Sequence, residues 1–239
     1  PLYQRLDGIY FNSAFDYTAQ NSNIKRTYDL STGVIFQSNF NKELTFKYFG
    51  SHNNYAVIHN GADINLINST EKIKIDKYKN IWSCASSWRP HKRLNENIRY
   101  FLEHSGPDDG LIVAGSVSER VQHDRVHYVG ELTTDKLFSL YKASKYFLHL
   151  AWLDHCPNVV VDAAACGSIV ICSSAGGTKE VAGKNAIIIE ENEWNYEPVK
   201  LYKPPSLDFS KKAENVWHQN NDFDMMSVSK KYYNFINGG

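Results

Sequence analysis

The sequence predicts an α/β protein built on a Rossmann-like parallel sheet with helices on both faces. Between about residues 80 and 190, short apolar runs typical of strands alternate with amphipathic segments typical of helices. Strands that alternate with helices pair in parallel and are covered on both sides, so this region predicts one complete sheet of that kind. The expected strands are Ile81–Ser86, Leu111–Gly115, Val126–Val129, Tyr146–Leu150, Ile169–Cys172 and Ala186–Ile189.

The clearest expected helix lies between the third and fourth of these strands. In Thr134–Lys145, the side chains of Leu137, Leu140, Tyr141 and Ser144 fall on one face, behind a threonine cap. Such a face is what a helix needs in order to pack on a sheet.

Residues 1–62 predict a truncated α/β portion of about two βα units, too few for a complete domain of this class. Gly33–Gln37 is apolar, and such a strand would leave open sheet edges unless another segment or chain covers them. The expected elements are strands at Asp7–Phe11, Gly33–Gln37 and Ala56–His59 and a helix around Asn39–Tyr48.

A hinge-like turn at His59–Asp63 divides the chain, which gives expected parts of 1–62, 63–205 and 206–239. The last part is expected to form two helices, near Ser210–Gln219 and Met226–Ile236, that pack back toward the N-terminal portion. Because the first residue is Pro and not Met, we expect a fragment or a processed chain.

Composition narrows the classes of partner and compartment. Lys+Arg and Asp+Glu both total 26, which argues against nucleic acid as the main partner. Four cysteines without a CxxC pair favour small buried hydrophobes in a reducing compartment, so we expect a cytoplasmic location. No run approaches the ~20 apolar residues that cross a bilayer, and no signal peptide opens the chain. Peripheral contact with a membrane stays open.

The segment Leu150–Gly167 carries the most chemical information. A strand ends near its start, a loop holds Asp154, and a helix is expected to begin near Pro157, a residue that suits the first helical position. Gly167 would end this helix. The free N–H groups at Asn158–Val160 then form a seat for an anion.

Two carboxylates flank this seat, Asp154 before it and Asp162 inside the helix. Four helical residues rise roughly 6 Å, comparable to the reach from a diphosphate to a ribose. One ligand with a sugar, a diphosphate and a ribose would therefore fit. The alternative is a capped helix with two solvated aspartates.

These residues belong to a longer ordered pattern. Its members are the turn Asn60–Gly61, the loop Ser87–Arg93, Leu111–Gly115, Val129–Gly130, Asp154, Asp162, Ala163–Ala165, Gly167, Ile169–Cys172 and Gly176–Glu180. Over about residues 30–190 the pattern resembles the retaining GT-B glycosyltransferases of family 4 (glycosyl transferases group 1). Those proteins usually carry Glu where this chain has Asp154 and Asp162.

The resemblance implies that residues 63–205 form a nucleotide-sugar donor-binding domain and assigns roles within it. Asp154 would hydrogen-bond hydroxyls of the donor sugar, and Asp162 would bind the ribose hydroxyls. Backbone N–H groups of Asn158 and Val159 would meet the distal phosphate.

Basic and loop residues complete the donor site that the resemblance implies. Arg89 and Lys92 lie where the family places the basic residues that bind the diphosphate. The alternative is a basic loop exposed to solvent. Whether Arg93 also binds the diphosphate stays open. His155 could reach the cleft, although a lone loop histidine is more often a surface residue. Gly177, in the Gly-Gly loop, is the remaining donor-binding candidate.

Residues 5–11 resemble a late strand and loop of the acceptor-side domain of the family, of which residues 1–62 would be a remnant. Asp7 is the candidate catalytic residue there, beside Asp154, Arg89 and Lys92; an Asp before Gly is equally often a turn former. The missing N-terminal segment or a second chain would complete the acceptor side.

The activity implied by the resemblance is transfer of a sugar from a UDP-, GDP- or ADP-sugar to a saccharide or lipid-linked acceptor. No metal or other cofactor is expected, because cations and a helix end can offset the charge of the leaving diphosphate. A non-catalytic nucleotide-sugar-binding module is an alternative, as is another GT-B enzyme, a phosphorylase or a sugar-nucleotide epimerase. A generic dinucleotide-binding protein is disfavoured, since no GxGxxG follows the first strand of this domain.

Overall fold

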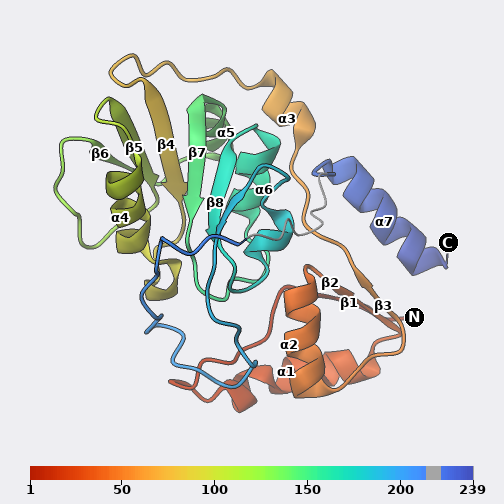
Figure 1. Cartoon of the computed structure of the whole chain (residues 1–239). Helices are drawn as coiled ribbons and strands as arrows, with labels where there is room; N and C mark the ends of the chain where they lie inside the picture. The colour runs from red at the N-terminus through yellow and green to blue at the C-terminus, as the bar shows by residue number, and fades with distance from the viewer. Residues whose placement is uncertain (214–221, 239) are drawn as a thin grey trace.

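The computed structural model describes residues 1–213 and 222–238 and contains two α/β parts, one built on three strands and one on six (Figure 1). The smaller part comprises β1 (Tyr3–Leu6), α1 (Tyr17–Leu30), β2 (Gly33–Phe36), α2 (Asn39–Phe49) and β3 (Tyr55–Val57). The larger part comprises α3 (Ile64–Ser69), β4 (Asn80–Ala85), η1 (Pro90–Lys92), α4 (Leu94–His104), β5 (Asp109–Ala114), β6 (Val126–Gly130), α5 (Thr134–Ala143), β7 (Ser144–His149), α6 (Asn158–Ala165), β8 (Ile169–Ser173), η2 (Thr178–Val181) and β9 (Ile187–Ile189). The chain then returns to the smaller part through α7 (Met225–Asn237).

The larger sheet confirms the predicted fold class. Its strands pair in parallel in the order β6-β5-β4-β7-β8-β9, and each contains most of a run expected from the sequence. Counted from β4, this is the 3-2-1-4-5-6 order of the Rossmann fold. The order reverses between β4 and β7, and ligands of such sheets bind in the crevice beyond the carboxyl ends of the strands at this point.

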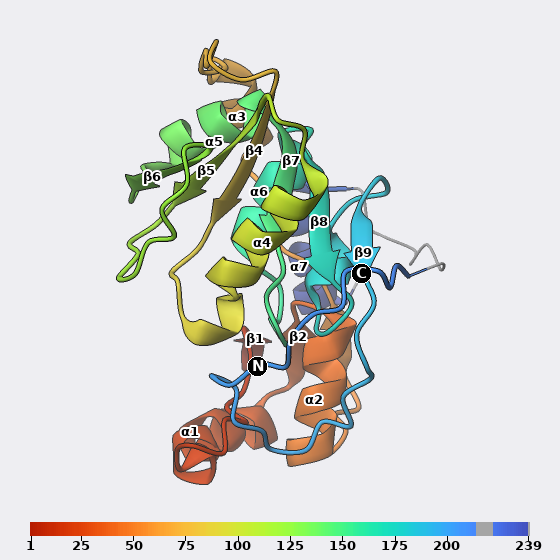
Figure 2. The same ribbon diagram turned by 60° about the vertical axis from the view of Figure 1, so that its left-hand side comes forward.

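Apolar side chains on both faces of this sheet are buried under separate layers. On one face, Phe138 and Tyr141 of α5 and Val160 of α6 pack against Ala85 and Phe147. On the other face, α4 packs against the alternate residues of the same strands, together with the segment around residues 207–209 (Figure 2). The two-residue period of a strand thus gives each strand one side chain for each layer.

One local expectation in the smaller part, the strand at Asp7–Phe11, is wrong. The first strand is Tyr3–Leu6, which pairs with Gly33–Phe36, whereas residues 7–11 form no strand. Ile9 and Phe11 are apolar because they enter the core of this part, not because they belong to the sheet. The edges of Gly33–Phe36 are covered, as the sequence required, because β1 and β3 pair with this strand on either side.

Helix α1 was not predicted from the sequence. It buries only Asn21 and Tyr28, so its apolar pattern is weak. The expected helix Thr134–Lys145 exists but ends at Ala143, and β7 starts at Ser144, whose hydroxyl donates to the carbonyl of Leu140 (2.8 Å). The hydroxyl of Thr133 makes no capping bond there.

The C-terminal helix α7 lies on the smaller sheet. Val228 packs with Ile35 and Ile58, and Arg5 donates from Nε to the hydroxyl of Tyr232 (3.0 Å). The predicted helix at 226–236 is confirmed. Of the helix expected at 210–219, residues 214–219 lie outside the described residues, and Ser210–Ala213 form a turn and a bridge with β9 instead.

All four cysteines are free thiols, and Cys84, Cys156 and Cys172 are buried. Among the described helices, none has the length and apolar character needed to span a membrane.

A buried ion pair holds together the loops at the carboxyl end of the larger sheet. Arg93 follows η1 and donates to both carboxylate oxygens of Glu191 (2.8 and 2.9 Å) and to the carbonyls of Leu150 (3.3 Å) and Pro205 (2.8 Å). The side chains of the pair are only 1% and 7% exposed. Arg93 is therefore occupied in joining loops after β4, β7 and β9.

We expect Arg93→Met to lower the free energy of unfolding by about 3–5 kcal/mol, because Glu191 would be left buried without its counter-charge. Urea unfolding followed by circular dichroism measures this. The double variant Arg93→Met/Glu191→Met should regain most of the loss. A single variant as stable as the parent would contradict this account.

Candidate functional site

The loops that follow β4 and β7 meet at the reversal point of the larger sheet. The β4 loop carries Arg89 and Lys92 on and beside η1, and the β7 loop carries Asp154 and His155. Because both strands end at the same edge of a parallel sheet, residues more than 60 positions apart come into contact. This is the position where the fold predicts a ligand site.

The side chains of Lys92, Asp154 and His149 form a partly enclosed cluster in this position. Lys92 donates from Nζ to Oδ2 of Asp154, and Nε2 of His149 lies 2.9 Å from the same oxygen. Burial alone would raise the pKa of the Asp154 carboxyl, but the His149 hydrogen bond and the Lys92 charge outweigh it and hold that pKa well below its usual range. Asp154 is therefore a fixed anion.

His149 at the end of β7 was missed in the sequence. Burial lowers the pKa of its imidazole, despite the opposing effect of Asp154, so the neutral ring donates to that carboxylate. A polar residue inside the otherwise apolar run Tyr146–Leu150 was the available signal. The sequence did not reveal that the chain turns back after β7 and brings Asp154 into contact with His149.

Of the basic residues in the β4 loop, only Lys92 reaches Asp154. The side chain of Arg89 is exposed and forms no hydrogen bond or ion pair with the described part of the chain. His91 between them is buried and stacked on Tyr202 (5.5 Å between ring centroids), and burial lowers its pKa to about 4. Arg93 takes no part in this group, because Glu191 holds it.

Helix α6 begins and ends where the sequence predicts. Pro157 precedes its first residue, and Gly167 follows it with φ +93°. Within the described residues, the N–H groups of Asn158 and Val159 have no hydrogen-bond partner, as expected for a first helical turn. The Asn158 amide oxygen accepts from Nδ2 of Asn60 (2.6 Å).

Asp162 does not face the Lys92 cluster. Its carboxyl lines a separate cavity of about 370 Å³, together with Asn158, Arg5, Asn60 and Tyr232. Burial raises its pKa from 3.8 to about 7. The two aspartates of the sequence pattern thus lie in opposite electrostatic environments.

Asp7 belongs to the Asp162 side of the molecule. Its exposed carboxylate is 2.8 Å from Nη1 of Arg5 and accepts a hydrogen bond from Gln37. Arg5 also donates from Nη2 to Asn60 (3.0 Å), which in turn contacts Asn158. A polar chain thus runs from β1 to the start of α6.

The backbones of Gly177 and His155 are in close contact. The Gly177 N–H donates to the carbonyl of Asp154 (2.7 Å), and a Cβ on Gly177 would stand 1.9 Å from the carbonyl oxygen of His155. The glycine therefore allows the loop after β8 to support the loop that carries Asp154. The His155 ring contacts Phe11 and Phe40 of the smaller part, and its Nδ1 is buried with no hydrogen-bond partner among the described residues. Burial lowers the pKa of His155 to about 4.

Glu180, the last residue of the Gly-Gly segment, joins the two parts. Its carboxylate accepts hydrogen bonds from the N–H groups of Asn39 (2.7 Å) and Phe40 (2.9 Å) at the start of α2, and His59 lies 3.1 Å away. Burial raises the pKa of this carboxyl, but the bonds from His59 and from α2 outweigh that effect and lower it. The sequence pattern contained Glu180 but gave it no role.

Comparison with known structures shows the same fold in several glycosyltransferases. Sucrose-phosphate synthase from Thermosynechococcus elongatus is 13% identical with a TM-score of 0.70, over 99% of this chain and 68% of that one. Anabaena HepE in complex with UDP-glucose is 18% identical with a TM-score of 0.69, over 100% of this chain and 72% of that one. A UDP-forming trehalose-phosphate synthase from Burkholderia xenovorans, in complex with glucose-6-phosphate, is 14% identical with a TM-score of 0.64. The match covers 99% of this chain and 66% of that one. No curated protein sequence matches the chain.

The parallel-sheet α/β fold is that of a GT-B type protein. The model of the glycosyl transferases group 1 family matches residues 67–196, more than half of the chain. The protein belongs to this family and is a glycosyltransferase by fold and family.

We expect Gly177→Ala to destabilise the protein by about 1–3 kcal/mol, because its Cβ would overlap the His155 carbonyl and displace the Asp154 loop. Gly106→Ala is the matched control, since its Cβ would approach no atom closer than 3.9 Å. Thermal and urea unfolding of both variants test this. Equal stability of the two would contradict the contact.

We expect Asp162→Asn to remove a fall in stability between about pH 4 and pH 7. A raised pKa means that the folded protein keeps a proton that the unfolded chain has already released in this window, so the parent loses stability as pH rises. The variant should gain on the order of 2 kcal/mol over the parent on going from pH 4 to pH 8. Urea unfolding without nucleotide, at both pH values, measures the difference. Parallel pH profiles would show that burial does not perturb this carboxyl.

Proposed function

We propose that the protein is a retaining glycosyltransferase that moves a sugar from a nucleoside-diphosphate sugar to a saccharide or lipid-linked acceptor without a metal ion. The observation that carries this is the contact of Lys92 with Asp154 at the reversal point of a Rossmann-like sheet, in a chain of this family. A fixed carboxylate beside a cation suits a ligand that joins a sugar to a diphosphate.

The donor would bind with its diphosphate between the β4 loop and the start of α6. The ammonium group of Lys92 has three N–H donors, so it can keep its hydrogen bond to Asp154 and still bind a phosphate oxygen. Arg89 has no competing contact among the described residues and supplies a second cation. The N–H groups of Asn158 and Val159 add the positive end of the helix.

Asp154 would accept hydrogen bonds from hydroxyls of the donor sugar, and Asp162 would bind the ribose from its own cavity. The chemical step breaks the bond between the anomeric carbon and the diphosphate oxygen and forms one from that carbon to the acceptor oxygen. The acceptor proton passes to the leaving diphosphate on the same face, which retains configuration. Lys92, Arg89 and the helix end offset the charge that develops on the diphosphate.

We propose UDP as the nucleotide. HepE was crystallised with UDP-glucose, and the trehalose-phosphate synthase is described as UDP-forming. GDP and ADP are the alternatives to compare.

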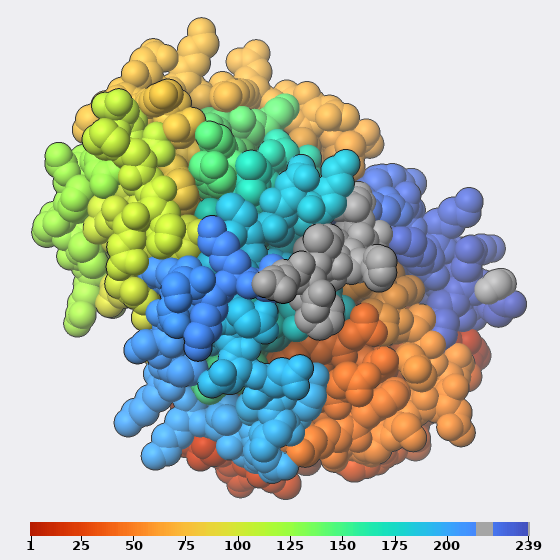
Figure 3. Space-filling view, in the orientation of Figure 1, coloured from red at the N-terminus to blue at the C-terminus, as the bar shows by residue number. Residues whose placement is uncertain are grey.

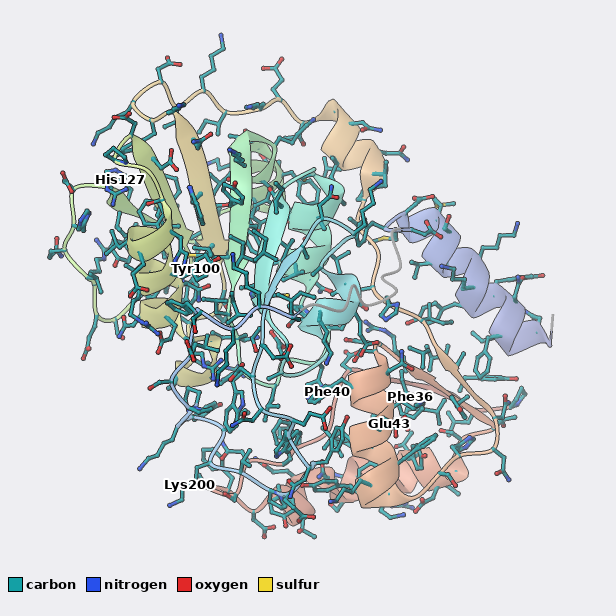
Figure 4. All side chains as sticks on the ribbon, in the orientation of Figure 1. Phe36, Phe40, Glu43, Tyr100, His127 and Lys200 are labelled. Carbon is teal, nitrogen blue, oxygen red and sulfur yellow. The ribbon has the colours of Figure 1, made fainter. Side chains whose placement is uncertain are left out.

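Calorimetric titration with UDP, GDP and ADP in EDTA tests the donor site. We expect one nucleotide to bind, and Arg89→Gln and Lys92→Met each to weaken it by about 10–100-fold, the loss of one charge-assisted contact. Lys200→Met is the control, because Lys200 lies on the outer margin of the molecule (Figure 4). Arg89 is exposed, so its variant should fold. If no nucleotide binds to folded protein, or if both variants bind like the parent, the donor site is wrong.

A non-catalytic nucleotide-sugar-binding module is the second candidate. It is favoured by the position of Asp162, which lines a different cavity from the one beside Asp154. Slow hydrolysis of the bound donor, followed by NMR, separates the two functions. Release of the sugar as the α-anomer from an α-linked donor supports a retaining enzyme, and tight binding without any hydrolysis or transfer supports the module.

A further inference from the structure

A second cavity, of about 560 Å³, lies where the two parts of the molecule meet. Its walls come from α2, from the loop after β8 and from the segment after β9, which in Figure 3 lies in light blue against the orange N-terminal part. Its volume falls in the range of about 300–1,000 Å³ that is typical of small-molecule sites. Lys92, Asp154 and His149 are not among its described lining residues.

Three aromatic rings form one wall of this seam cavity. Trp194 lies 5.2 Å from Tyr196 and 6.0 Å from Phe40, centroid to centroid, and Tyr196 lies 5.8 Å from Phe40. Phe11 packs behind Trp194 (4.8 Å). Figure 4 labels Phe40 and Glu43, which come from the first turns of α2. Phe40 is buried, and Trp194 and Tyr196 are partly exposed; a partly exposed aromatic face beside polar groups is a surface on which the C–H face of a pyranose packs.

Two residues of this cavity have a left-handed backbone. Leu153 has φ +55° and Tyr196 has φ +63°, conformations that cost roughly 1–2 kcal/mol outside glycine. The Tyr196 turn is held by Lys47, which donates to the carbonyl of Asn195 (2.9 Å), and by the Trp194 indole, which donates to the carbonyl of Glu197 (3.0 Å). Such strain is typically retained where a side chain must be presented to a ligand.

The described lining is acidic, with the single cation Lys179 and the glutamates Glu43, Glu180, Glu190, Glu191 and Glu193. Glu191 is paired with Arg93, Glu43 with Lys42, and Glu180 with the start of α2 and with His59. Glu190 and Glu193 are exposed and form no ion pair within the described chain. Burial and the nearby carboxylates raise the pKa of Tyr196, so its phenol remains a hydrogen-bond donor.

We propose that the seam cavity binds a neutral or amino-substituted sugar unit of the acceptor and rejects sugar phosphates. Carboxylates accept hydrogen bonds from hydroxyl or ammonium groups, whereas they repel a phosphate. The Asp154 side chain points to Lys92, while its neighbours Leu153 and Gly176 line the cavity. The bound unit therefore lies on the other side of the Asp154 loop from the Lys92 contact. This inference rests on the proposed function, for which it names the acceptor class.

Saturation-transfer NMR on the whole chain tests it with methyl glucoside, glucosamine, cellobiose and glucose 6-phosphate. We expect saturation of the three unphosphorylated sugars and little of the phosphate. Trp194→Ala should weaken binding about tenfold, the loss of one stacking contact. Tyr17→Ala, which alters a ring in another cavity along α1, should leave it unchanged.

Trp194→Ala could also disturb the fold, because Trp194 packs on Phe11. The double variant Glu190→Lys/Glu193→Lys avoids this, since both residues are exposed. It should increase the signal of glucose 6-phosphate relative to methyl glucoside. The proposal is overturned by no saturation of any unphosphorylated sugar, by equal saturation of the phosphate in the parent, or by equal effects of Trp194→Ala and Tyr17→Ala. The nucleotide titration is independent: nucleotide binding without sugar binding rejects this cavity alone, and the reverse rejects the donor site.

Discussion

The carboxylate of Glu180 fixes how the two parts of the molecule face each other. It lies at the end of the Gly-Gly loop of the larger part and receives the first N–H groups of α2 from the smaller one. A helix start presents unpaired N–H groups and a positive dipole, so a buried carboxylate is a matched partner for it. Both the seam cavity and the contact of His155 with Phe11 and Phe40 depend on this junction.

The same loop supports the site from behind. Gly177 is in van der Waals contact with the backbone of the Asp154 loop. Only a residue without Cβ allows these two loops to approach so closely. Asp154 is thereby held against Lys92 and His149. The position of the anion is thus set by backbone packing, and its charge state by two neighbouring side chains.

Much of the larger part could be predicted because its signals are local. Buried parallel strands are apolar throughout, and α6 has Pro157 before it and Gly167 after it, so the order of elements and this helix followed directly. The smaller part was harder, since α1 buries little and Phe11 is apolar without being in a strand. His149, Glu180 and Tyr196 acquire their positions from contacts across long stretches of chain, which no local pattern records. The separation of Asp162 from Asp154 has the same origin, because it depends on which side of α6 faces the smaller part.

The charges around the Asp154 loop are divided between its two sides. Arg89 and Lys92 lie on one side, where a diphosphate would need cations, and the excess glutamates lie on the other, beside Trp194 and Tyr196. By charge alone, the first side would attract a phosphate and the second would repel it, while the second side would still accept a hydroxylated ring without charge. Because one loop separates the two environments, a donor and an uncharged acceptor could bind without competing for the same groups. If both proposed sites bind their ligands, this division gives a chain with no net charge a physical means to discriminate between two carbohydrate ligands.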